Sequence, residues 1–211
     1  MISEGRDPNE NKTTILELYN EIQSAVRRIS LARLKEASGW DDIVPSQPPM
    51  NQVGQGNWII LMISNWYGMR LVFSCHFLTQ HALQLAEGKL NKKGLSTKEA
   101  HDFIAEYCNL TVGAIKSSLS ALIPQYFDRS GGATLSLPDR RADYDVEELE
   151  NTDASRKVTW SLAFSGGELS FSSALELNER ELLHGVKDGL DKFKKAISTI
   201  KIVGTGEVEF F

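Results

Sequence analysis

The sequence lacks the apolar segments of membrane and exported proteins. Its longest apolar run, Trp58 to Ile63, is far shorter than the roughly 20 residues that a helix needs to cross a bilayer. The N-terminal stretch MISEGRDPNENK is polar and acidic, whereas a signal peptide starts with basic residues and continues with an apolar run. We therefore expect a cytoplasmic protein.

Cysteine and histidine are scarce. The two cysteines, Cys75 and Cys108, fall within apolar patterns, so we expect buried free thiols rather than a disulfide. His76 and His81 are five residues apart, which does not place two metal ligands on one helical face, and the other two histidines are isolated. We expect no bound metal, and we expect surface or core histidines with hydrogen-bond partners.

Basic residues are not in excess. The chain has 23 Lys and Arg against 28 Asp and Glu, a net charge of -5, which disfavours nucleic acid as a partner because phosphates require a concentrated basic surface. No glycine-rich phosphate loop and no G-x-S-x-G motif occurs, so no cofactor of its own is predicted. With 41% hydrophobic and 24% charged residues, the composition is that of one soluble globular domain.

The clearest pattern that is present predicts a long helix from Ser96 to Leu122. Ser96 and Glu99 form a capping box, in which the hydroxyl accepts the N3 amide and the glutamate returns to the cap amide; Pro124 ends the helix. At about 100° per residue, one side of this helix forms a core face. Its members are Ile104, Cys108, Thr111, Ile115, Ser118 and Leu122, with Tyr107 and Leu119 on the flanks.

The opposite side of this helix carries a carboxylate, a carboxamide and a glycine. Glu106, Asn109 and Gly113 are spaced i, i+3, i+7 and lie about 180° from the core face. Asp102 falls on the same stripe, and we expect the whole stripe to face water. A glycine inside a helix costs about 1 kcal/mol relative to alanine. Close approach of a partner would account for it; on an ordinary solvated face it would be neutral drift.

The first part of the chain is predicted to contain another long helix. Residues 1–11 are expected to be disordered. Thr14 and Glu17 form a second capping box, and the helix that they start runs to about Ala37 and stops at Gly39. The proline- and glycine-rich connection that follows has room for one short strand.

The rest of the chain is predicted to complete an α+β domain, an antiparallel β-sheet built from hairpins with long helices packed on it. Residues 12–177 would form the domain, and 178–211 a C-terminal helix and tail of the same domain. The predicted elements are a hairpin of 57–64 with 69–75, a short helix from Phe77 to Glu87 closed by Gly88, a strand at 133–137, a mobile charged loop at 139–156, a hairpin of 157–165 with 168–176 turned at Gly166-Gly167, a helix from Asn178, and an edge strand in the tail.

The segment from Glu106 through Asn109 to Gly113 resembles the E-x-x-N-x-x-x-G helix signature of the CheC/CheX/FliY family of chemotaxis phosphatases. From about residue 14 to 177 the order of elements is similar to the CheX branch, which covers about three quarters of the chain. The region from Asn178 onward and the long charged loop exceed the CheX pattern.

This resemblance implies a phosphatase that acts on the phospho-aspartate of a CheY-like response regulator. Asn109 would position the attacking water, and Glu106 would pair with the receiver's lysine. Asp102 and Gly113 would belong to the docking face. The receiver would supply Mg²⁺, and the family resemblance also implies a homodimer.

A second stripe on the first helix repeats the spacing. Glu17, Asn20 and Ser24 stand at i, i+3, i+7, and CheC proteins carry two such helices. Because Ser24 replaces the glycine and the outer face of any amphipathic helix is polar, a degenerate second site and a chance pattern both remain open.

Two other functions compete with the phosphatase. One is a non-catalytic receiver-binding or flagellar-switch adaptor, against which the presence of both Glu106 and Asn109 argues. The other is a small-ligand module with a pocket lined by tryptophans. Trp58 and Trp160 lie inside predicted strands, which favours core packing instead.

Overall fold

The structure is a computed structural model that describes residues 8–46, 58–66, 69–122, 134–142, 157–177, 201–202 and 208–209. The elements within these residues are α1 (Pro8–Ser38), β1 (Val44–Ser46), β2 (Trp58–Trp66), β3 (Met69–Phe77), α2 (Thr79–Leu90), α3 (Thr97–Leu122), β4 (Thr134–Leu135), β5 (Asp139–Ala142), β6 (Lys157–Phe164), β7 (Gly167–Leu177), β8 (Lys201–Ile202) and β9 (Val208–Glu209).

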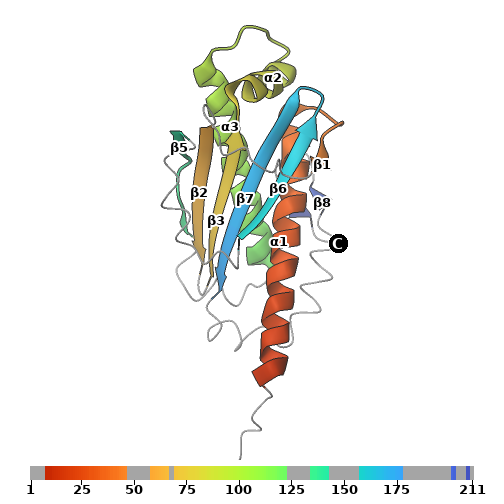
Figure 1. Ribbon diagram of the computed structural model, residues 1–211, viewed down its shortest axis with the longest axis vertical. Coiled ribbons are helices and arrows are strands. Elements are labelled where there is room, and N and C mark those ends of the chain that lie inside the picture. The colour runs from red at the N-terminus through yellow and green to blue at the C-terminus, as the bar shows by residue number, and fades with distance from the viewer. Residues whose placement is uncertain are drawn as a thin grey trace, which may run out of the picture.

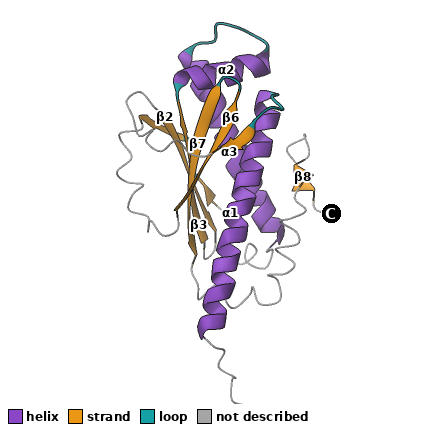
Figure 2. Cartoon of the chain, turned by 45° about the vertical axis from the view of Figure 1, so that its right-hand side comes forward, coloured by secondary structure: helices purple, strands orange, loops and turns teal. Residues whose placement is uncertain are grey.

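Two long helices pack on one face of an antiparallel sheet (Figure 1). The strand order is β1-β6-β7-β3-β2, and the outer edge of β2 pairs with both β4 and β5. α3 contacts β2 and β3, while α1 contacts α3 and β6, so the two helices form one layer beside the sheet (Figure 2). The predicted α+β architecture of hairpins covered by long helices is confirmed.

Both predicted hairpins form. β2 pairs with β3 from Trp58 opposite Phe77 to Trp66 opposite Met69, and β6 pairs with β7 across a turn at residues 165–166. β3 and β7 then pair in the middle of the sheet, with Met69 opposite Leu177. The inner sheet therefore consists of two hairpins joined along one central seam.

One apolar core fills the space between the helices and the sheet. On α3, every predicted core residue with a described side chain is buried; these are Ile104, Cys108, Thr111, Ile115 and Ser118. On α1, Ile22, Val26 and Ile29 are buried, three and four residues apart on one side of the helix. The Trp160 ring stacks on Phe171 with centroids 5.4 Å apart, which confirms that this tryptophan packs in the core.

The cysteines and the described histidines have structural roles. Cys75 and Cys108 are buried free thiols, as predicted, and burial is the main cause that raises the pKa of Cys75. His101 Nε2 lies 2.9 Å from Thr79 Oγ1, and His81 Nδ1 lies 2.9 Å from a backbone carbonyl oxygen of β7. Both histidines therefore have the partners that we expected.

The described residues contain neither a cluster of metal-ligating side chains nor a membrane-spanning helix. None of their His, Cys, Asp and Glu side chains gather into a group of three or more that is suited to a metal ion. None of the helices described has a stretch long and apolar enough to span a membrane.

α1 begins earlier than predicted. Its first residue is Pro8, a favoured residue in the first turn because an N–H is not needed there. Thr14 lies inside the helix, so the predicted capping box with Glu17 is wrong, and residues 8–11 are helical rather than disordered. The predicted end is confirmed, because Gly39 follows the helix with a φ of 74°.

α2 is displaced toward the C-terminus relative to the prediction. Phe77 belongs to β3, and Gly88 lies inside the helix, which ends instead at Asn91 with a left-handed φ of 47°. A Cβ at Gly88 would collide with the indole of Trp40. This glycine therefore admits a neighbouring side chain and does not end the helix.

Two segments near the end of the chain also differ from expectation. Residues 139–142, predicted as part of a mobile loop, form β5 on β2, where an edge strand tolerates charged side chains. In the tail, β8 and β9 pair with each other in a separate two-stranded sheet, so the predicted edge strand is wrong. The helix predicted from Asn178 and residues 143–156 lie outside the described residues.

Candidate functional site

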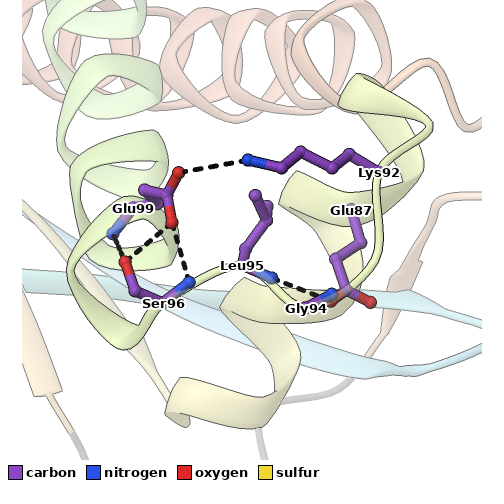
Figure 3. Close-up of polar contacts among 6 residues, drawn as sticks. All are labelled: Glu87, Lys92, Gly94, Leu95, Ser96 and Glu99. Atoms are coloured by element: carbon purple, nitrogen blue, oxygen red, sulfur yellow. Dashed lines mark hydrogen bonds and ion pairs between the residues drawn. The ribbon is translucent and has the colours of Figure 1, made fainter.

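The helix that carries the predicted site has a well-defined start. The Ser96 N–H donates to the Glu99 carboxylate at 2.8 Å, and the Glu99 N–H donates to Ser96 Oγ at 3.2 Å, so the capping box is confirmed (Figure 3). The Ser96 amide, and after it the Ser96 hydroxyl, which donates to the same carboxylate at 2.7 Å, lower the pKa of Glu99. The ionised carboxylate therefore stabilises the folded protein at pH values above the ordinary glutamate pKa of about 4.3. This stabilisation is lost as the pH falls through the lowered pKa of Glu99.

The loop before α3 is held by the end of α2. Glu87 Oε1 accepts the N–H of Gly94 at 2.7 Å and that of Leu95 at 3.4 Å (Figure 3). Lys92 Nζ lies 3.7 Å from the Glu99 carboxylate, and the Leu95 side chain is buried. The first turn of α3 is therefore fixed relative to α2 by both polar and apolar contacts.

A buried tyrosine ties the middle of α3 to α1. The Tyr107 hydroxyl donates to the carbonyl oxygen of Ser30 at 3.0 Å, and its ring contacts Phe171 edge-on with centroids 6.1 Å apart. Burial raises the pKa of Tyr107 well above its ordinary value, so the hydroxyl remains a donor. Tyr107 directly follows Glu106, and these contacts hold that part of the helix in one position.

The capping box gives a stability prediction. We expect Ser96→Ala to lower the free energy of unfolding by about 1 kcal/mol, because the substitution leaves the Glu99 amide without its acceptor. Urea denaturation measures the change. Ser117→Ala, at an exposed serine inside the same helix, is the control and should be neutral or slightly stabilising. Equal effects of the two substitutions would contradict a role for the cap.

The predicted stripe lies on the outer face of α3. Glu106 and Asp102 are exposed, and Asn109 and Gly113 are half-buried. A Cβ at Gly113 would meet no atom of the described residues within 4 Å, so no packing within that part of the chain requires a glycine there. Asp102 and Glu106 therefore face water as predicted, whereas Asn109 and Gly113 are partly covered.

The second predicted stripe lies on α1. Asn20 is exposed, whereas Glu17 and Ser24 are half-buried. Glu17 and Asn20 are therefore on α1, which packs beside α3 in the same helical layer. Whether this stripe functions stays a prediction.

A pocket that the sequence did not reveal lies beside the α3 stripe; we call it the α1–α3 pocket. Its volume is about 290 Å³. Its walls are Arg33, Glu36 and Ala37 of α1, Lys89 of α2, and Phe103, Glu106, Tyr107 and Leu110 of α3. Glu106 belongs to both the stripe and the pocket. The sequence offers one hint, the apolar Leu110 directly after Asn109; in the structure its side chain is 47% exposed.

Comparison by sequence finds no relative. No protein-family model matches the chain, and no curated protein matches it. Comparison by structure does find matches. A CheC-like superfamily protein from Shewanella sp. PV-4 aligns with a TM-score of 0.56 and 17% identity, over 74% of this chain and 97% of that one.

Two further structures agree with the first. The chemotaxis protein CheX from Desulfovibrio desulfuricans has a TM-score of 0.54 and 16% identity, over 74% of this chain and 99% of that one. A chain of the CheX-CheY-BeF3-Mg²⁺ complex from Borrelia burgdorferi has a TM-score of 0.55 and 11% identity, over 72% of this chain and 96% of that one. The chain has the CheC/CheX fold. Within this CheC/CheX fold, the E-x-x-N stripe lies on the second long helix, α3.

Proposed function

We propose that this protein is a phosphatase of the CheC/CheX type that hydrolyses the phospho-aspartate of a CheY-like receiver. The observation that carries the proposal is the position of Glu106 and Asn109 on the outer face of α3, in a chain with the CheC/CheX fold. Support for the partner comes from the Borrelia structure, in which a CheX is in complex with a CheY.

Asn109 positions the attacking water. Its carboxamide enters the receiver's active site and holds a water in line with the acyl phosphate. A neutral amide suits this task because it both donates and accepts hydrogen bonds and does not repel the phosphoryl group. An acyl phosphate is already activated and Mg²⁺ belongs to the receiver, so positioning alone accounts for several kcal/mol of barrier lowering.

Glu106 sets the register of the complex. One helical turn before Asn109, its exposed carboxylate pairs with the receiver's active-site lysine. Gly113, one turn after Asn109, leaves room for the receiver surface to approach the helix backbone. The homodimer implied by the family resemblance stays a prediction.

The direct test is the decay of a phosphorylated receiver. CheY-like receivers from the same organism are phosphorylated with acetyl phosphate, and loss of phosphate is followed with and without this protein. We expect catalytic acceleration for at least one receiver. Tight binding of the receiver without acceleration would instead identify the adaptor alternative.

Glu106→Ala tests the register. We expect the KM for the phosphorylated receiver to rise about thirtyfold, or by about 2 kcal/mol, because the receiver's lysine loses its partner in a desolvated interface. Glu106→Gln keeps the shape and removes the charge, so it should behave in the same way. An unchanged KM in either variant would show that the proposed register is wrong.

A further inference from the structure

The α1–α3 pocket lies alongside the stripe that the proposed function assigns to the receiver. Residues on a helix advance by 100°, so Phe103 and Leu110, which are seven residues or about two turns apart, lie on the same flank of α3 beside Glu106. Glu106 itself is both the proposed lysine partner and a pocket wall. A protein surface that covers the stripe and contacts Glu106 must therefore also cover the mouth of the pocket.

The pocket has an apolar floor and a charged rim. Ala37, Phe103, Tyr107 and Leu110 supply the apolar surface. On the rim, Arg33 is paired with Glu36 at 2.7 Å, and Lys89 donates to the backbone carbonyl oxygen of Glu36 at 3.2 Å. Tyr107 bonds to α1 and Arg33 is buried, so the walls are held by contacts within the chain. A preformed apolar pocket ringed by polar groups is typical of a protein-binding hot spot.

We propose that the α1–α3 pocket binds one large apolar side chain on the surface of the receiver, beside the lysine that pairs with Glu106. This inference rests on the proposed function for the identity of the partner. The pocket then contributes affinity and selects the receiver, whereas the stripe carries the residues that promote hydrolysis.

Size and position both favour a protein side chain as the occupant. A volume of about 290 Å³ is at the lower limit of small-molecule sites, roughly 300 to 1,000 Å³, and is sufficient for one aromatic or long aliphatic side chain. Leu110 is a large apolar side chain that is 47% exposed, as expected of a wall that a partner covers. Glu106 belongs both to the pocket and to the stripe on which the receiver is proposed to dock. The docked receiver is therefore the surface that can supply this side chain.

The test uses matched leucine truncations in the full chain. Leu110→Ala removes a pocket wall, whereas Leu16→Ala removes an equally large side chain, 60% exposed, on α1 about 25 Å from Arg33 along that helix. Binding of the BeF3-activated receiver and steady-state dephosphorylation are measured for both variants. We expect Leu110→Ala to raise Kd and KM about tenfold, with its effect in KM rather than in kcat, and Leu16→Ala to match wild type.

A second variant fills the pocket from the opposite wall. Ala37→Phe places a ring in the space from the α1 side and leaves Glu106 and Asn109 themselves unsubstituted, and the same rise in Kd and KM is expected. Thermal melting confirms that the variants are folded.

The outcomes separate this inference from the proposed function. An active wild type whose Kd and KM are unchanged by Leu110→Ala and by Ala37→Phe would overturn the pocket assignment alone. A wild type that binds the receiver through Leu110 but does not dephosphorylate it would overturn the phosphatase and retain the pocket. A wild type that neither binds nor dephosphorylates any receiver would overturn both.

Discussion

Replacement of Asn109 by alanine is expected to abolish receiver dephosphorylation while the melting temperature stays at the wild-type value. The side chain lies on the outer face of α3 and is absent from the apolar core, so its removal leaves the packing intact. Loss of one preorganised group that acts on the reacting atoms costs about two to three orders of magnitude in kcat. Single-turnover decay of the phosphorylated receiver measures the loss.

Asn20→Ala is the matched control. It makes the same substitution at an exposed asparagine of the other long helix, in the stripe that repeats the spacing. If that stripe is degenerate, the control keeps wild-type turnover; a loss in both variants would identify a second site. Wild-type turnover by Asn109→Ala would refute the mechanism.

Gly113→Leu is expected to change stability and activity in opposite directions. A Cβ at this position meets no described atom within 4 Å, so we expect the isolated protein to accept the leucine, whose higher helix propensity raises stability by up to about 1 kcal/mol. On a docking face, the same side chain prevents the receiver from approaching the helix, and dephosphorylation falls sharply. Paired melting curves and phosphatase assays detect both effects.

The series at position 113 distinguishes a docking face from a solvated one. Gly113→Ala should stabilise the helix as well, with a smaller loss of activity than leucine causes. A stabilised and fully active Gly113→Leu protein would mean that this side of α3 meets only water. Destabilisation would contradict the open space that the structure shows around this residue.

Local chemistry was sufficient to predict the helix that carries the site. The Ser96–Glu99 box involves residues three apart, and the buried face of α3 follows from helical geometry, so no knowledge of the rest of the fold was needed. The stripe of Glu106, Asn109 and Gly113 could be predicted for the same reason. Its partner could be named only from the family resemblance.

Features that depend on distant contacts were missed. Gly88 looked like a helix end, but it lies inside α2 because the Trp40 indole occupies the space of its missing side chain. The charged residues of β5 looked like a loop, but they pair with β2 at the edge of the sheet, where Arg140 lies over the Trp58 ring at 5.8 Å. The α1–α3 pocket needs three helices, and no single stretch of sequence predicts it.

The central seam between β3 and β7 has a consequence for how the protein folds. Met69 and Leu177 face each other although they are more than 100 residues apart, and α3 lies in the chain between them. Closing a loop of about 100 residues costs about 4 kcal/mol of chain entropy, which must be overcome before the strands pair. Each hairpin closes a much shorter loop. We therefore expect the seam to form late in folding. Until it forms, α3 can pack on the β2–β3 hairpin but lacks the contact of its Tyr107 ring with Phe171 on β7.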